Sequence, residues 1–248
     1  MSVAAPTHAR LAEVEVRKMT DTRSGRWLLA VVALAGVALV VVTLTSAPQD
    51  DRTWVSFFSA SMAGVAVLFP VVGVVAVTSE WSQRTAPTTF ALVPDRRRVV
   101  SAKLTATLAL TVLAVVIAFV VATAGRGVGE ATGRASGAWS LPAAALTTIP
   151  LAGVLGIWTG VAFGLLLRSA PLAIVAYFGV PTVWGILTDL ISSTRPAAGW
   201  LDPGRAMDPL YEAGMTGAEW ARLATAMALW LMLPLLAGVA RLTRSEVN

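Results

Sequence analysis

Six long runs without a single Asp, Glu, Lys or Arg dominate this sequence, and each is close to the length that crosses a lipid bilayer. At 1.5 Å per residue, about 20 helical residues span the roughly 30 Å hydrocarbon core. Only 13% of the 248 residues are charged, against about 25% in an ordinary globular domain. Those charges gather in short patches between the apolar runs, whereas a soluble domain distributes them over all its surface helices. The sequence therefore predicts an all-α, polytopic membrane protein.

Each run gives one expected span, and the six spans cover residues 27–47, 54–78, 99–124, 142–167, 170–191 and 221–241. Pro142 suits the first turn of the fourth helix, because a proline there lacks only a donor that the helix does not use. Pro70, Pro150 and Pro181 fall inside or near spans, where they predict kinks. No internal repeat divides the chain. Residues 1–248 are therefore expected to form a single transmembrane domain, with residues 1–26 leading into it.

The cations are divided unequally between the two sides of the expected bundle. Of the 19 Lys and Arg residues, 13 precede the first span or follow the second, fourth and sixth, and 6 lie on the other side. Cytoplasmic segments of membrane proteins are the cation-rich ones. Both termini are thus predicted to be cytoplasmic, in a multi-pass protein of the plasma (cytoplasmic) membrane.

Two segments outside the spans predict further helices. Apolar side chains of residues 9–23 share one side of a helical wheel, although Glu15 and Arg23 interrupt it. This predicts an amphipathic interfacial helix on the inner leaflet, with a disordered basic tail as the alternative. Between spans five and six, residues 192–220 combine prolines and glycines with tryptophan and tyrosine. That mixture is typical of short helices at the outer interface.

Several catalytic chemistries lack their residues in this chain. There is no cysteine, and the single histidine, His8, lies in the N-terminal tail, so no thiolate or histidine metal site and no histidine base within a span is expected. Lys18 and Lys103 are followed by Met and Leu instead of Ser or Thr, so neither belongs to an ATP-binding P-loop. The cations flank spans and do not form a nucleic-acid recognition module. We therefore expect no enzyme activity, no metal, no cofactor of the chain's own and no nucleic-acid partner.

Polar and small residues within the spans give two further candidates. Asp189 lies near the outer end of the fifth span, where an acid is costly enough to suggest a gate or a substrate contact. The alternative is an interfacial acid that reaches water or pairs with Arg195. No acid lies near a span centre, which disfavours proton-coupled transport. Gly156, Gly160 and Gly164 share one helical face, and they favour close helix packing, either within the chain or across a dimer.

The segment between spans two and three, residues 79–103, carries the most specific pattern. An acid ends the second span, an Arg-Thr pair follows, a Pro-x-Arg turn comes next, and a lysine opens the third span. These residues are Glu80, Arg84, Thr85, Pro94, Arg96 and Lys103. In this pattern the chain resembles the permeases of the ABC type-2 exporter family, and the six-span layout, the lead-in helix and the long outer segment also match that family. Pro87 departs from the pattern, because a proline breaks the short coupling helix expected there.

The resemblance implies a dimer of two six-span permease chains, identical or different, joined to separate P-loop ATPase subunits that bind ATP and magnesium. Glu80, Arg84, Thr85, Pro94 and Arg96 would then form the coupling contact with the ATPase. Anionic membrane lipid is the alternative partner for the arginines. The expected function is the membrane subunit of an ATP-driven exporter of hydrophobic or amphipathic solutes. A non-transporting membrane anchor or sensor is the alternative, and a secondary transporter is the third candidate.

Overall fold

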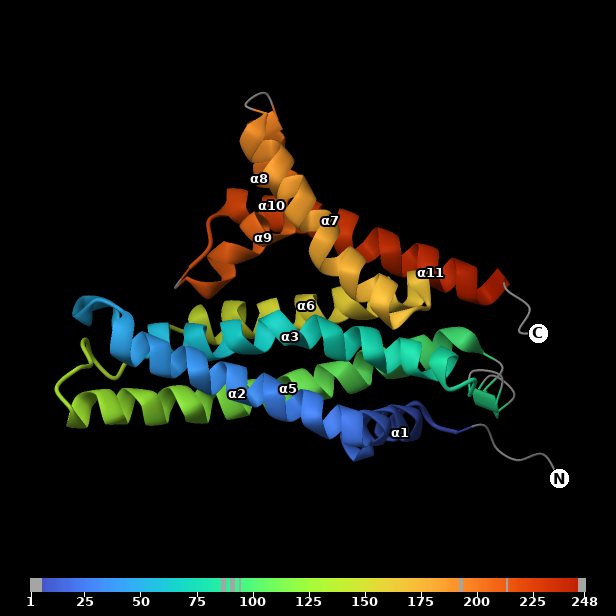
Figure 1. Ribbon diagram of the computed structural model, residues 1–248, viewed down its shortest axis with the longest axis horizontal. Coiled ribbons are helices and arrows are strands. Elements are labelled where there is room, and N and C mark those ends of the chain that lie inside the picture. The colour runs from blue at the N-terminus through green and yellow to red at the C-terminus, as the bar shows by residue number, and fades with distance from the viewer. Residues whose placement is uncertain are drawn as a thin grey trace.

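The computed structural model describes residues 6–85, 88–89, 92–93, 95–191, 194–212 and 214–244, except for the side chain of Arg195. It is 86% helical, and the described residues contain no strand, so the predicted all-α class is confirmed (Figure 1). The α-helices are α1 (His8–Asp21), α2 (Arg23–Ser46), α3 (Trp54–Ser82), α5 (Arg96–Ala131), α6 (Ala145–Leu167), α7 (Ala170–Leu190), α8 (Arg195–Leu201), α9 (Pro203–Met207), α10 (Gly217–Met227) and α11 (Leu233–Arg244). Shorter elements are the 3₁₀ turns η1 (Gln49–Asp51) and η3 (Asp208–Tyr211) and a π-helical segment, η4 (Ala228–Met232).

Six of these helices have the length and hydropathy of membrane spans: α2, α3, α5, α6, α7 and the continuous helix formed by α10, η4 and α11. The chain is therefore a polytopic helical membrane protein, as predicted. Most helix ends differ from the predicted bounds by one to four residues; α2 begins at Arg23, α3 ends at Ser82 and the sixth span begins at Gly217. Two of the differences have a visible cause. The third span continues to Ala131 because Arg126 and Glu130 pair across one turn at 3.5 Å, so charge does not end the helix. The fourth begins at Ala145, and Pro142 only supplies a carbonyl to Leu146 before the first turn.

The helices α3 and α6 form the centre of the bundle. Gly160 of α6 lies directly against the Pro70 carbonyl of α3, and Gly73 of α3 lies against the Ile157 carbonyl of α6, so a Cβ at either glycine would overlap backbone. A Cβ at Gly164 would also lie 3.1 Å from the Val74 carbonyl oxygen. The predicted glycine face thus packs within the chain. Its third member, Gly156, also faces Pro70 but leaves ordinary van der Waals distance.

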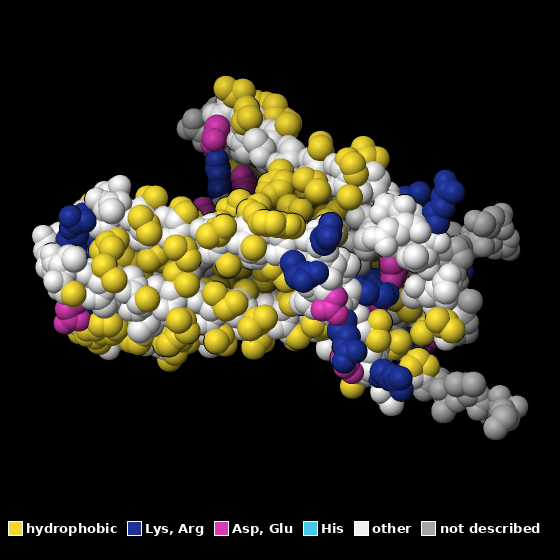
Figure 2. Space-filling view, turned by 60° about the horizontal axis from the view of Figure 1, so that its bottom comes forward, with side chains coloured by type: hydrophobic (Ala, Val, Ile, Leu, Met, Phe, Trp, Pro, Cys, Tyr) yellow, Lys and Arg dark blue, Asp and Glu magenta, His cyan; other side chains and the backbone are white. Residues whose placement is uncertain are grey.

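The outer helices present apolar side chains away from this centre. Within the most apolar stretch of each helix, 67% of the residues are buried in α6 but 6% in α7. Figure 1 shows α7 diverging from the long parallel helices, and Figure 2 shows hydrophobic side chains covering much of the bundle's length. A surface of this composition is suited to lipid.

The alternation of the spans brings both termini to one end of the bundle (Figure 1). We call it the basic end; it contains α1, the end of α3, the start of α5, the α6–α7 turn and the end of α11. The α2–α3 and α5–α6 connections lie at the opposite end of the long helices. The short helices α8, α9 and η3 connect α7 to α10, which confirms the helices predicted between spans five and six.

Candidate functional site

The lead-in helix α1 is held on the bundle at the basic end. Thr7 caps its first turn by accepting a hydrogen bond from the Arg10 amide at 3.3 Å. Thr22 ends α1 and at the same time caps α2, since its hydroxyl accepts from the Gly25 amide at 3.1 Å. The buried face of α1 contacts α5, α2 and α3. The predicted N-terminal helix is thus confirmed, and its apolar face is covered by the chain itself.

Four charged side chains from three helices meet beneath α1. They are Glu15 and Lys18 of α1, Glu80 of α3 and Lys103 of α5, and we call them the ion cluster. Lys103 Nζ lies 2.6 Å from Glu15 and 3.1 Å from Glu80. Lys18 Nζ donates to the same two carboxylates at 2.6 and 2.8 Å. The exposed fraction is 3% for Lys103, 5% for Glu15 and 6% for Glu80, so these ion pairs join three helices away from bulk water.

Lys103 donates two hydrogen bonds, to Glu15 and to the Ala76 carbonyl, and forms an ion pair with Glu80. An ammonium group has three donors. Around Lys103 Nζ lie three acceptors: Glu15 Oε2, Glu80 Oε1 and the Ala76 carbonyl, the last at 2.9 Å. The planar fork of an arginine has a different geometry and two more donors. A compact ammonium is therefore the group that this position requires.

Lys18 closes the ion cluster on its solvent side, where 42% of its side chain is exposed. Burial lowers the pKa of Lys18, but hydrogen bonds and charges from Glu15 and Glu80 more than compensate, so its pKa lies above the ordinary value of 10.5. A raised lysine pKa adds stability that is fully present below the ordinary value and is lost as the pH rises through the raised pKa. Lys18 is therefore cationic across the physiological pH range.

The predicted residues Glu80, Arg84 and Thr85 lie together at the end of α3, where they form a helix cap. The Thr85 amide donates to the Glu80 carbonyl at 2.9 Å, and the Arg84 amide donates to Trp81 at 3.2 Å. Arg84 itself has a left-handed backbone with φ of 55°. These three features define a Schellman motif, in which the left-handed position is usually glycine. The Arg84 side chain is exposed, whereas the Glu80 carboxylate is directed into the ion cluster.

The start of α5 holds the next predicted residue. The Arg96 guanidinium donates to the Leu242 carbonyl and so connects α5 to the end of α11. Arg98 donates to the Pro6 carbonyl at 2.8 Å. Both guanidinium groups thus bind backbone carbonyls of the same chain. Pro94, also predicted to take part in coupling, lies outside the described residues.

Asp189 lies far from this end, in the last turn of α7. Its carboxylate pairs with Arg205 of α9 at 2.5 Å, and both side chains are substantially exposed. Arg205 also lies 3.7 Å from Asp202. The residue weighed as a partner in the sequence, Arg195, has a side chain outside the described part. The observed arrangement is a surface ion pair between α7 and the segment that follows it.

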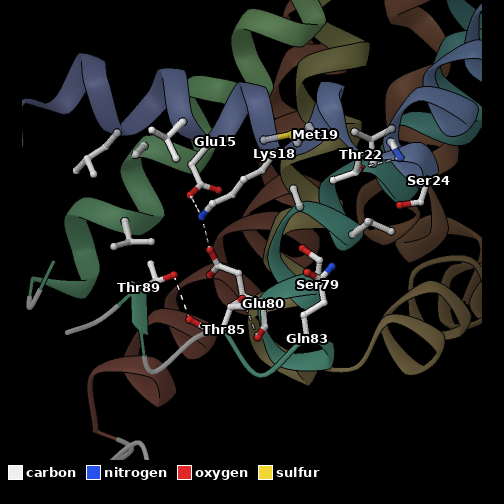
Figure 3. Close-up of a pocket in the computed structure, with 18 of the residues that line it drawn as sticks. Glu15, Lys18, Met19, Thr22, Ser24, Ser79, Glu80, Gln83, Thr85 and Thr89 are labelled. Atoms are coloured by element: carbon white, nitrogen blue, oxygen red, sulfur yellow. Dashed lines mark hydrogen bonds and ion pairs between the residues drawn. The ribbon is translucent and has the colours of Figure 1, made fainter. Parts of the chain in front are cut away.

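A cavity of about 560 Å³ lies beside the ion cluster, between α1, the start of α2, the end of α3 and the start of α5 (Figure 3). We call it the cluster cavity. Glu15, Lys18 and Glu80 form part of its wall, and Thr22, Ser79 and Gln83 add hydroxyl and amide groups. Its remaining walls are largely apolar. Pockets of this size and composition are typical of small-ligand sites.

The sequence pattern does not predict Glu15 and Lys18 as site residues. Glu15 interrupts an apolar helical face, and an acid at such a position is the signal of a buried partner. The chain contains two lysines among many arginines, and both belong to the ion cluster. No protein-family model matches the chain, and no curated protein matches it either. The assignment of function therefore depends on the geometry of the basic end.

Proposed function

We propose that the chain is the membrane-spanning subunit of an ATP-driven exporter, and that its basic end receives a separate P-loop ATPase. The observation that carries the proposal is an exposed arginine, Arg84, at the end of a helix that the ion cluster fixes to two other helices. Arg84 projects from the capped end of α3, and one turn earlier Glu80 joins that helix to α1 and α5 through the ion cluster. A protein that binds Arg84 and displaces the end of α3 would therefore displace α1, α3 and α5 together.

The sequence also supports a separate ATPase subunit. Neither lysine is followed by the Ser or Thr that a nucleotide-binding P-loop requires. An exporter built from this chain therefore takes its energy from another subunit. The proposal includes a second permease chain, identical or different, to complete the translocation pathway, and a cytoplasmic location for the basic end, where most cations gather.

Within this proposal the predicted residues have different roles. Arg84 offers its guanidinium to a partner. Glu80 acts one step behind it, because its carboxylate already binds Lys18 and Lys103. Thr85 contributes through its backbone to the cap that orients Arg84. Arg96 would connect the same movement to α11.

The test is recovery of the ATPase with variants of two exposed arginines. The chain is tagged in its own cell, purified in mild detergent and assayed for an associated P-loop ATPase and for ATP hydrolysis. Arg84→Gly removes the guanidinium but keeps the left-handed turn, because glycine adopts that conformation readily. We expect about tenfold less recovered ATPase, equivalent to the loss of about 1.4 kcal/mol.

The matched control is Arg134→Gly, which removes an exposed arginine from the opposite end of the bundle. It should leave ATPase recovery unchanged. The proposal is wrong if no P-loop ATPase accompanies the wild-type chain, or if both variants lose it equally. Transport driven by an ion gradient without any ATPase would instead support a secondary transporter.

A further inference from the structure

The cluster cavity changes from polar to apolar along α3. One face of this helix presents Gln83 and Ser79 near the basic end, followed by Val75 and Val72 deeper in the span. Steps of three or four residues keep these positions on one side of a helix. The stretch from position 72 to 83 is about 16 Å long at 1.5 Å per residue. The cavity therefore reaches from the end of the span well into its apolar part.

The facing wall changes in the same direction. Thr22 and Ser24 lie at the α1–α2 corner, and Leu28 and Leu29 follow along α2, away from the basic end. Figure 3 shows Thr22, Ser24, Ser79 and Gln83 around the polar part of the cavity. These two walls thus share one polarity gradient. The remaining wall near the basic end is mixed: it combines the hydroxyl groups of Thr85, Thr88 and Thr89 with apolar side chains of Leu11, Val14, Leu92 and Val93. A ligand that matches both walls has a hydrogen-bonding head at the basic end and an apolar tail toward the middle of the span.

The charges on the cavity wall are already matched to one another. Lys18 contacts both Glu15 and Glu80, and each of these carboxylates also contacts Lys103. The cluster holds two cations and two anions, so its formal charge is zero. An anionic or a cationic head would have to separate these pairs or enter without a counter-ion, and burial of an unpaired charge is costly. Hydroxyl and amide groups remain to bind an uncharged head.

We infer that the cluster cavity binds a single-chain amphiphile with an uncharged, hydroxyl-rich head group, which enters from the adjoining leaflet. A volume of about 560 Å³ suits one small ligand. The head lies among Thr22, Ser24, Ser79 and Gln83, and the tail lies between α2 and α3. That the cavity binds such a ligand is inferred from the cavity alone. That the bound ligand is cargo for export rests on the proposed function.

The probe is monooleoylglycerol, compared with oleate and oleylamine, which carry a similar chain with an anionic or a cationic head. Binding is measured on the full chain in nanodiscs without any ATPase. We expect monooleoylglycerol to bind at least about tenfold more tightly than either charged analogue. Val75→Trp, which fills the cavity, should weaken its binding by at least about tenfold.

Val67→Trp is the matched control, because Val67 lies on the same helix and is 57% exposed. It should leave binding of monooleoylglycerol unchanged. Equal affinity for the three probes, or equal effects of the two tryptophans, would mean ordinary partition into lipid and would overturn the inference. So would recovery of a peptide instead of a lipid from the purified chain.

Since no ATPase is present, these outcomes are independent of the exporter proposal. Stimulation of ATP hydrolysis by monooleoylglycerol in the ATPase complex would then test the cargo role separately.

Discussion

At the scale of single residues, Lys103 shows how this chain places charge beside a bilayer. Its ammonium is buried, but three acceptors from α1 and α3 surround it. A buried ion pair adds little net stability compared with an apolar replacement of the whole set, yet removing one partner leaves an uncompensated charge. The ion cluster therefore specifies how α1, α3 and α5 fit together more than it adds to their total stability.

This account predicts unequal roles for the two lysines of the ion cluster. Lys103→Met should lower the free energy of unfolding by about 3–5 kcal/mol, since Glu15 and Glu80 remain buried beside an apolar chain. Lys18→Met should cost about 1 kcal/mol or less, because Lys18 is partly solvated and Lys103 still binds both acids. Denaturant titration in mild detergent measures both values.

A second substitution distinguishes charge from packing. In Lys103→Met, Lys18 is the one cation left for two carboxylates of the ion cluster. Adding Glu15→Met removes the excess negative charge, so part of the lost stability should return. A double variant that is less stable than Lys103→Met would show that packing, not charge balance, determines the effect of Lys103.

At the scale of elements, the sequence indicated more about the spans than about the site. Long uncharged runs predict apolar helices directly, because length and hydropathy are local properties. The pairing of Glu15 with Lys103 joins residues far apart in the chain, so it depends on how helices pack and is not visible in a local pattern. The sequence pattern predicts that the Arg84–Thr85 pair belongs to a docking motif. The structure adds that this pair terminates α3. The sequence does not predict this helix end, because the left-handed position of such a cap is usually glycine and here it is Arg84.

The contact between α3 and α6 gives a prediction at this scale. Gly160→Ala places a Cβ against the backbone of Pro70 and should lower the free energy of unfolding by about 1–3 kcal/mol. Gly127→Ala is the control, because a Cβ there meets nothing within 4 Å. It should add about 0.5–1 kcal/mol by favouring the helix. Both are measured by the same detergent titration. Similar effects at the two glycines would contradict the tight α3–α6 contact.

At the scale of the whole molecule, the structure divides the chain into a lipid-facing bundle and a charged end. The six spans return both termini to the basic end, and there α1, α3 and α5 are joined by buried ion pairs. The cluster cavity lies beside this ion cluster. A partner that pushes on Arg84 would therefore act on the helices that border the cavity, which is the coupling that an ATP-driven exporter needs.

The most direct test of this account is crosslinking from one end of the bundle or the other. The chain contains no cysteine, so Gln83→Cys at the basic end and Gln49→Cys at the opposite end each introduce a single thiol in place of an exposed glutamine. A thiol-reactive crosslinker is applied to native membranes, and the products are identified by mass spectrometry. The account predicts a crosslink between a P-loop ATPase and the Gln83→Cys chain, and none with Gln49→Cys. An ATPase captured from position 49, or from neither position, would contradict it.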